Sequence, residues 1–321
     1  MASEFDLIER HFKRPSRRAL LGVGDDCALL APTPGLEMAI STDMLVSGVH
    51  FFADTDPRRL GHKTLAVNLS DLAAMGATPR YATLALALPV VDEAWLARFA
   101  GGLFALANAH EVELIGGDTT RGPLTLCMTV IGEVPAGAAI RRDGARPGDE
   151  IWVSGTLGDA AFGLALRKGL ATGAGALGEA CIARLEAPTP RLALGVALRG
   201  LASAMLDVSD GLIGDLAHVA RASGVSARID IERLPLAPAL RLRPRADAVK
   251  YALAGGDDYE LCFTASPRHH EAVLLAGRAS GVAVTVIGNV LADVGTPVFL
   301  DGSESQAFSA LSGYDHFGAA A

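Results

Sequence analysis

The sequence predicts a two-domain protein of mixed α and β structure, and three observations support this fold class. A chain of 321 residues is long for one hydrophobic core and suits two domains of ordinary size. Amphipathic helical patterns alternate with short apolar runs in both halves. A stretch rich in Pro and Gly separates the halves. We therefore expect an α/β (α+β) domain at residues 1–136, a linker at 137–149 and a second α/β domain at 150–321.

Hydrophobic periodicity places the elements of the first half. A short amphipathic segment carries Phe5, Leu7, Ile8 and Phe12. Farther along, apolar residues three and four apart predict helices, and short apolar or alternating runs predict strands. The expected elements are a strand at 37–41, a helix at about 57–74, a strand at 82–88, a helix at 92–110, and strands at 112–115 and 124–133.

The second half shows the same alternation. It opens with an apolar run, and a Gly-bounded turn then leads into a helix within GTLGDAAFGLAL. A break at Pro188 and Pro190 introduces another helix. The remaining expected elements form a mixed sheet with its helices. The strands are at 150–154, 204–208, 227–231, 261–264, 282–287 and 298–300, and the helices are at 212–223 and near 247–254 and 267–280.

Composition limits the class of partner. Half of the residues are hydrophobic, which suits a globular protein with large cores, and the net charge of -8 argues against nucleic acid or an anionic membrane as main partner. Glu4, Asp6 and Glu9 occupy the region where a signal peptide would need apolar residues, and the most apolar stretch, 81–91, is too short to span a bilayer. We expect a cytoplasmic protein.

The four cysteines form no CxxC pair. Each lies among apolar neighbours, so we interpret all four as small core residues in a reducing compartment. They are Cys27, Cys127, Cys181 and Cys262.

Aspartates recur beside glycine or at the end of an apolar run. Gly lets the backbone approach a ligand closely, and the short Asp side chain keeps its carboxylate near the chain. Oxygen ligands of this kind suit Mg²⁺, which takes one or two carboxylates together with substrate phosphates. Any one of these residues could instead be a helix cap or turn residue, but the whole set favours a shared cation site. Its members are Asp25, Asp26, Asp43, Asp71, Asp118, Asp207 and Asp210.

Several common nucleotide motifs are excluded. The sequence has no GxxxxGK[ST] loop, because GHKT carries His62 where the second Gly should stand; Lys63 is therefore expected to be a surface or snorkelling side chain. GVGDDC lacks the third Gly of a dinucleotide fingerprint. Protein-kinase signatures and a GxSxG nucleophile elbow are missing too. A nucleotide would need a less common fold.

An ordered series of motifs resembles the bacterial thiamine-monophosphate kinases, a family within the aminoimidazole-ribonucleotide-synthetase-like superfamily. The resemblance spans nearly the whole chain, and the LSDLAAMGA, GGDDYEL and GYDHF combination is specific to that family. The motifs are GVGDDCALL, ISTDMLVSGVHF, VNLSDLAAMGA, LIGGDTTRGP, RDGA, LDVSDGLIGDLAH, GGDDYELCF and GYDHF. The resemblance implies an N-terminal domain that binds ATP and Mg²⁺ and dimerises through its sheet, followed by a C-terminal α/β domain. It also implies γ-phosphoryl transfer from ATP to thiamine monophosphate, giving thiamine diphosphate.

The resemblance assigns roles residue by residue. The implied ligands of several Mg²⁺ ions are Asp26, Ser41, Thr42, Asp43, Asp71, Asp118, Asp207 and Asp210. The implied ATP contacts are Gly117, Asp118, Arg142 and Ser209. The implied thiamine phosphate contacts are His50, Asp258 and Tyr314. The chain departs from the family at two places, with Asp257 where many relatives carry Glu and Tyr314 where Trp is common.

The residues themselves leave other readings open. Arg142 could clamp phosphate oxygens or remain a solvated charge in a flexible linker. His50 could be a structural histidine, and Tyr314 could stack on a thiamine ring or cover a core edge. Asp257 and Asp258 form a like-charge pair, so at least one should find a cationic partner or a capping role. No nucleophile is expected, because metal-held aspartates suffice for direct transfer.

Three functions are compatible with the pattern. The first is the ATP-dependent kinase, a phosphotransferase with a phosphate acceptor. The second is another ATP-using enzyme of the superfamily that activates an amide or a selenide; the absence of Cys before Arg18 weighs against the selenide variant. The third is a non-catalytic sensor of nucleotide and thiamine phosphates, which would have little need for so many cation ligands.

Overall fold

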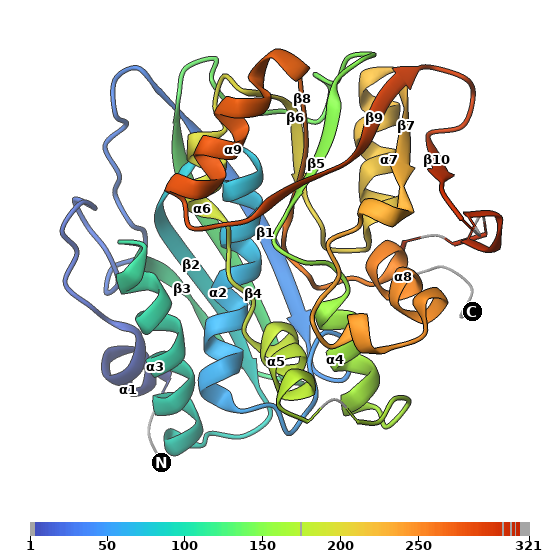
Figure 1. The fold of residues 1–321 in the computed structure, drawn as a ribbon. Coiled ribbons are helices and arrows are strands. Elements are labelled where there is room, and N and C mark those ends of the chain that lie inside the picture. The colour runs from blue at the N-terminus through green and yellow to red at the C-terminus, as the bar shows by residue number, and fades with distance from the viewer. Residues whose placement is uncertain (1–3, 174, 304, 309, 312, 315–321) are drawn as a thin grey trace. The chain divides into compact units, whose positions relative to one another are not determined.

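The computed structural model describes residues 4–173, 175–303, 305–308, 310–311 and 313–314 (Figure 1). The chain divides into two compact units. Unit 1 comprises Met1–Leu72 and Ala77–Gly137, and unit 2 comprises Ala73–Gly76 and Ala138–Ala321. No helix in the described ranges is long and apolar enough to cross a membrane.

Unit 1 is built on a four-stranded sheet with the order β1-β4-β2-β3. Strands β1, β4 and β2 pair antiparallel, whereas β2 and β3 pair parallel. The elements are α1 (Glu4–Leu7), the π-helical turn η1 (Ile8–Phe12), β1 (Leu36–Val46), α2 (Pro57–Ala74), β2 (Thr78–Leu88), α3 (Glu93–Ala109), β3 (Glu113–Arg121) and β4 (Thr125–Pro135).

One face of this sheet is buried and the other is open. Along β4, Leu126, Met128 and Val130 are buried while the residues between them are partly exposed, because alternate side chains point to opposite faces. Helices α2 and α3 lie over one face (Figure 1). Helix α3 begins where the Asp92 carboxylate caps it, accepting hydrogen bonds from the N–H groups of Ala94 and Trp95 at 2.9 and 3.0 Å.

Unit 2 contains a six-stranded sheet with the order β10-β7-β9-β5-β8-β6. The β7–β10 pair is parallel and the other pairs are antiparallel. The strands are β5 (Glu150–Ser154), β6 (Ala202–Asp207), β7 (Val225–Asp230), β8 (Leu261–Ala265), β9 (Val284–Ala292) and β10 (Val298–Asp301). The helices are α4 (Asp159–Arg167), α5 (Gly175–Glu186), α6 (Leu192–Ala197), α7 (Leu212–Ser223), α8 (Arg245–Ala254) and α9 (His270–Ala279), with short 3₁₀ turns η2 (Ile231–Arg233), η3 (Leu240–Leu242), η4 (Pro267–His269) and η5 (Ser305–Phe308).

The predicted fold class is confirmed, and several element bounds need correction. The ranges 57–74 and 212–223 are helices and 150–154 is a strand, as expected. Strands β1 and β3 extend farther than predicted, so Asp43 and Asp118 lie within strands instead of in the turns after them. Helix α5 was not predicted, because its opening residues, GALG, include two glycines, which lower helix propensity.

Three side chains lie in an environment other than the one expected from the sequence. Lys63 is buried, with 2% of its surface exposed, and its Nζ donates a hydrogen bond of 3.3 Å to the main-chain oxygen of His50. Cys27 is exposed and Cys127 is partly exposed, whereas Cys181 and Cys262 are core residues as expected. Residues 24–27 are all exposed, so the apolar neighbours of Cys27 along the chain do not bury it.

Candidate active site

The first group of predicted ligands lies where β1 meets α2 in unit 1. Ser41 donates a hydrogen bond to the Asp71 carboxylate at 2.5 Å. The Asp43 N–H donates to the side-chain oxygen of Asn68 at 3.0 Å, and because alternate residues of a strand share a face, Asp43 lies on the same face of β1 as Ser41. Thr42 points to the other face, because its hydroxyl lies 2.7 Å from that of Thr129. The structure therefore brings Ser41 and Asp71 together and places Asp43 on the same face of β1, whereas the Thr42 hydroxyl lies on the opposite face.

A second group lines a cavity of about 660 Å³ within unit 1. Asp25 and Asp26 contribute from the loop before β1, and Gly116, Gly117 and Asp118 contribute from β3. Gly117 has a φ of +145°, and a Cβ there would lie 1.9 Å from the main-chain oxygen of Leu84. Only glycine fits such a close approach of two strands. An apolar portion of the cavity, which includes Ile8 and Phe12, adjoins these polar groups.

Strand register relates the two groups in unit 1. Asp43 pairs with Met128, Met128 with Leu84, and Leu84 with Gly117, so these residues lie at one level across the sheet. Three strand spacings separate Asp43 from Gly117, roughly 14 Å. Asp43 and Asp118 therefore occupy opposite edges of the sheet, and they do not form one carboxylate cluster within this unit.

His50 lies in a tight turn that follows β1. Its Nδ1 accepts a hydrogen bond of 3.0 Å from the Val46 N–H. The neutral imidazole must then carry its proton on Nε2, which leaves Nε2 as a donor. The Lys63 Nζ also stabilises the turn, because it donates a hydrogen bond to the His50 main-chain oxygen. This geometry suits a side chain that donates a hydrogen bond to an anionic ligand.

In unit 2, Asp207, Ser209 and Asp210 occupy the end of β6 and the loop that follows it. Asp207 is buried and Asp210 is exposed. The loop is shaped by Asp215, whose carboxylate accepts hydrogen bonds from the N–H groups of Ser209 and Asp210, both at 3.0 Å. Burial raises the pKa of Asp215 to about 7, and the N–H donors oppose this shift. Sequence reasoning did not identify Asp215, although it lies within the LDVSDGLIGDLAH motif.

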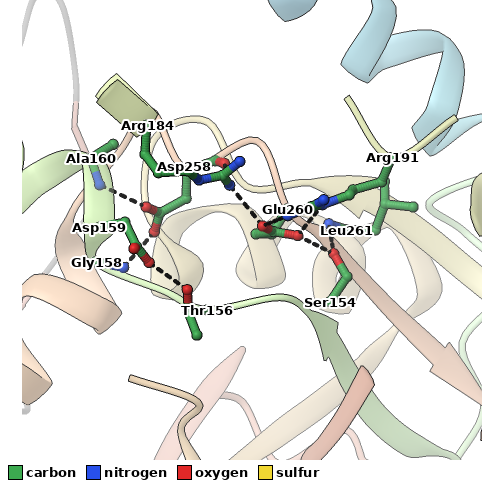
Figure 2. Close-up of polar contacts among 10 residues, drawn as sticks. All are labelled: Ser154, Thr156, Gly158, Asp159, Ala160, Arg184, Arg191, Asp258, Glu260 and Leu261. Carbon is green, nitrogen blue, oxygen red and sulfur yellow. Dashed lines mark hydrogen bonds and ion pairs between the residues drawn. The ribbon is translucent and has the colours of Figure 1, made fainter. Parts of the chain in front are cut away.

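Asp258 has a capping role in unit 2, one of the two outcomes expected for the acidic pair. Its carboxylate accepts hydrogen bonds from the N–H groups of Gly158 at 2.6 Å and Ala160 at 3.1 Å, at the start of α4 (Figure 2). Only 1% of Asp258 is exposed, and burial raises the pKa of its carboxyl. Neighbouring Asp257 accepts a hydrogen bond of 3.0 Å from the Tyr259 hydroxyl.

The remaining predicted contacts also belong to unit 2. Arg142 is exposed, and its main-chain oxygen accepts a hydrogen bond of 3.0 Å from Ser223. Tyr314 has an exposed side chain, and its N–H donates to the Asp210 main-chain oxygen at 2.8 Å. The end of the described chain therefore lies beside the Ser209–Asp210 loop. Asp315, His316 and Phe317, the last residues of the GYDHF motif, lie outside the described residues.

The donor chemistry of both units fits magnesium better than a softer metal. In the part of the chain that the structure describes, no three His, Cys, Asp or Glu side chains form a ready-made metal cluster. The available donors are instead small sets of oxygens, such as Ser41 with Asp71. Mg²⁺ commonly uses one or two carboxylates and completes its shell with water and substrate phosphates, so these sets are compatible with it.

Family comparisons account for nearly the whole chain. The family model of the AIR synthase related protein N-terminal domain matches residues 24–134, and that of the corresponding C-terminal domain matches residues 146–301. The chain therefore belongs to the AIR synthase related proteins. Among curated proteins it is 49% identical to the thiamine-monophosphate kinases of Salmonella typhimurium and Escherichia coli, over 98% of this chain and 98% of each relative. It belongs to the thiamine-monophosphate kinase family within this larger group.

Solved structures agree with this assignment. A thiamine-monophosphate kinase from Stenotrophomonas maltophilia is 49% identical, has a TM-score of 0.84, and matches over 92% of this chain and 94% of that chain. A structure described as AaThiL complexed with AMPPCP and TMP is 32% identical, with a TM-score of 0.78 and 89% coverage of both chains. The hydrogenase maturation protein HypE in complex with ATP, 23% identical with a TM-score of 0.73, shares the fold.

Proposed function

We propose that this chain transfers the γ-phosphoryl group of ATP to thiamine monophosphate and so forms thiamine diphosphate. The observation that carries the proposal is 49% identity to curated thiamine-monophosphate kinases over 98% of the chain. The related structure with AMPPCP and TMP supports the same two substrates. Relatives at this identity favour the kinase over the sensor and over the other ATP-using enzymes of the superfamily.

The chain's own residues would act by positioning and charge compensation. Phosphoryl transfer needs the attacking and leaving oxygens in line, and it asks little covalent chemistry of the protein. We infer that Asp26, Gly117 and Asp118 face the nucleotide phosphates in the unit 1 cavity. The Nε2 proton of His50 would be donated to the thiamine phosphate. A general base is unnecessary, because the acceptor phosphate is already ionised.

Several Mg²⁺ ions are part of the proposal. The residues that would hold them are Asp26, Ser41, Asp43, Asp71, Asp118, Asp207 and Asp210; Thr42, expected in this set, has its hydroxyl on the opposite face of β1. When bound, the ions would offset repulsion between the triphosphate and the acceptor phosphate. Ser209 and Arg142 would contact ATP, and Asp258 and Tyr314 would lie near the thiamine moiety. Support for this set comes from the motif match and from the oxygen donors gathered at β1, α2 and β3.

We further propose that the chain forms a homodimer through the open face of the unit 1 sheet. Met38, Ile40 and Met44 are more than half exposed and alternate along β1, so they share one face. Exposed apolar patches of this kind are typical of protein interfaces. Four free thiols also support the proposed location in the reducing cytoplasm.

The direct test is an activity assay with the purified chain. ATP, Mg²⁺ and thiamine monophosphate should yield thiamine diphosphate, and chelation of the divalent cation should abolish product formation. After brief exposure to γ-labelled ATP, the protein band should remain unlabelled, because transfer is direct. Absence of thiamine diphosphate at saturating substrates would overturn the proposed function. A labelled band chased by thiamine monophosphate would overturn direct transfer alone.

A further inference from the structure

A buried charged cluster in unit 2 lies outside every role assigned above. We define the Glu260 cluster as Glu260, Ser154, Arg184 and Arg191 (Figure 2). Glu260 is fully buried, and its carboxylate accepts hydrogen bonds from Arg184 at 2.7 Å, from Arg191 Nε at 2.7 Å and from Ser154 at 2.5 Å. Arg191 adds a second hydrogen bond through Nη2, which makes its contact bidentate.

The segment before Glu260 has an unusual backbone. In the described part of the chain, three non-glycine residues have positive φ, and two of them are Asp257 at 67° and Tyr259 at 50°. Such conformations are energetically unfavourable for non-glycine residues and persist only where the surrounding contacts hold the backbone in place. The surroundings here do so, because Arg184 also donates to the Asp258 main-chain oxygen at 3.0 Å while the Asp258 carboxylate is held by α4.

This strained segment pairs directly with the loop of Ser209 and Asp210. The Asp257 N–H donates to Ser209 oxygen at 2.8 Å, and the Tyr259 N–H donates to Val208 oxygen at 2.9 Å. The Val208 N–H returns a bond of 2.8 Å to Glu260 oxygen. Contact is close, since a Cβ on Gly256 would lie 2.4 Å from Ser209 oxygen. The backbone between Val208 and Asp210 can therefore shift only if the segment from 256 to 260 shifts too.

We propose that the Glu260 cluster positions the Ser209–Asp210 loop for magnesium-nucleotide binding, with Glu260 and Arg191 as positioning residues that touch no substrate. This inference rests on the proposed function, which places Ser209 and Asp210 at the nucleotide and its ions. Glu260 fixes a strained segment, and that segment fixes the main chain that carries the two ligands. Residues that support metal ligands in this indirect way typically change metal affinity or activity by about 10–100-fold when altered.

The test compares two buried glutamates of the same unit. Glu260→Gln weakens the cluster, and Glu186→Gln is the matched control, because Glu186 is also buried and pairs with Arg167 at 3.3 Å. Both variants should lose thermal stability. Only Glu260→Gln should raise the Mg²⁺ concentration for half-maximal activity, by about tenfold or more. It should also weaken calorimetric binding of AMPPCP in the presence of Mg²⁺, a readout that needs no turnover.

A second pair of variants keeps the test decisive if Glu260→Gln does not fold. Arg191→Lys retains the charge but loses the bidentate geometry, and Arg167→Lys is its control. Arg191→Lys should shift the Mg²⁺ midpoint in the same direction, while Arg167→Lys should leave it unchanged. An unchanged midpoint and unchanged AMPPCP binding in the Glu260 and Arg191 variants that fold, or equal shifts in the controls, would overturn the proposal. Failure of the wild-type chain to make thiamine diphosphate would overturn the proposed function. The comparison of AMPPCP binding between the test and control variants would remain valid.

Discussion

Two aspartates allow the metal-assisted mechanism to be tested at the scale of single residues. Asp118 lies in β3 and lines the unit 1 cavity, whereas Asp210 follows β6 in unit 2. Asn preserves the side-chain shape at both positions and removes one negative charge. We expect Asp118→Asn and Asp210→Asn each to lower kcat by about 10²-fold or more, because metal stabilisation of the transition state is worth several kcal/mol. Steady-state kinetics at saturating Mg²⁺ and ATP provide the measurement.

Stability should change little in these variants, by under about 1 kcal/mol, because both side chains are exposed and Asn keeps the shape of Asp; at Asp210, in the loop after β6, Asn is also a good turn residue. Asp247→Asn is the control, because Asp247 is an exposed residue in the first turn of α8 with no predicted role. Near-wild-type kcat in both test variants would show that neither carboxylate takes part in metal-assisted transfer.

Cysteine reactivity tests the cavity independently of turnover. Cys27 is exposed and lines the cavity beside Asp26, whereas burial raises the pKa of Cys181 to about 12 and also raises the pKa of Cys262. Thiolates are the reactive form, so iodoacetamide at neutral pH should label Cys27 and spare the two buried thiols. Mg²⁺ with AMPPCP should slow that labelling, as followed by mass spectrometry of the peptides. Equal labelling rates with and without the nucleotide would show that the nucleotide does not bind in this cavity.

At the scale of elements, the sequence predicted those structures whose signal is local. The helix at 57–74 and the helix at 212–223 combine apolar periodicity with nearby breakers, and both have the predicted bounds. The predicted strand ended at Ile115, whereas β3 continues to Arg121. The prediction stopped early because glycine, which follows Ile115 twice, is uncommon in strands. Pairing with β2 keeps Gly116 and Gly117 extended, and this long-range contact leaves no local trace in the sequence.

A pair of glycine substitutions distinguishes a glycine that long-range strand pairing requires from one that only local helix propensity affects. Gly117→Ala in β3 should destabilise unit 1 by about 2–4 kcal/mol, since the new Cβ would meet the Leu84 main-chain oxygen at a positive φ. Gly101→Ala in α3 has open space around its Cβ and should stabilise by up to about 1 kcal/mol. Chemical denaturation measures both. Comparable stability changes of one sign would contradict the close approach of β2 and β3.

At the scale of the whole molecule, the candidate site depended on recognising an ordered set of motifs. Asp43, Asp118 and Asp210 are far apart in the sequence. Their positions beside glycine or at the end of apolar runs predicted cation ligands, but did not predict which other residues lie close to each of them. Register now places Asp43 and Gly117 at one level of the sheet in unit 1. Asp215, in α7, and Glu260, just before β8, were missed because a buried acid looks like an ordinary surface charge in the sequence until its partners are known.

The proposed dimer gives the last prediction. Ile40 is 60% exposed on the open face of β1, between Met38 and Met44, and a Lys there would place a charge in the centre of an apolar interface. Ile40→Lys should shift the light-scattering mass from two chains toward one, with the fold of the protomer retained because the side chain is not part of its core. Val294→Lys is the matched control, since Val294 is also 60% exposed but lies after β9 in unit 2. A wild-type mass of one chain at all working concentrations would rule out the dimer. If Ile40→Lys and Val294→Lys both convert the dimer to monomer, the contact does not lie specifically on the β1 face.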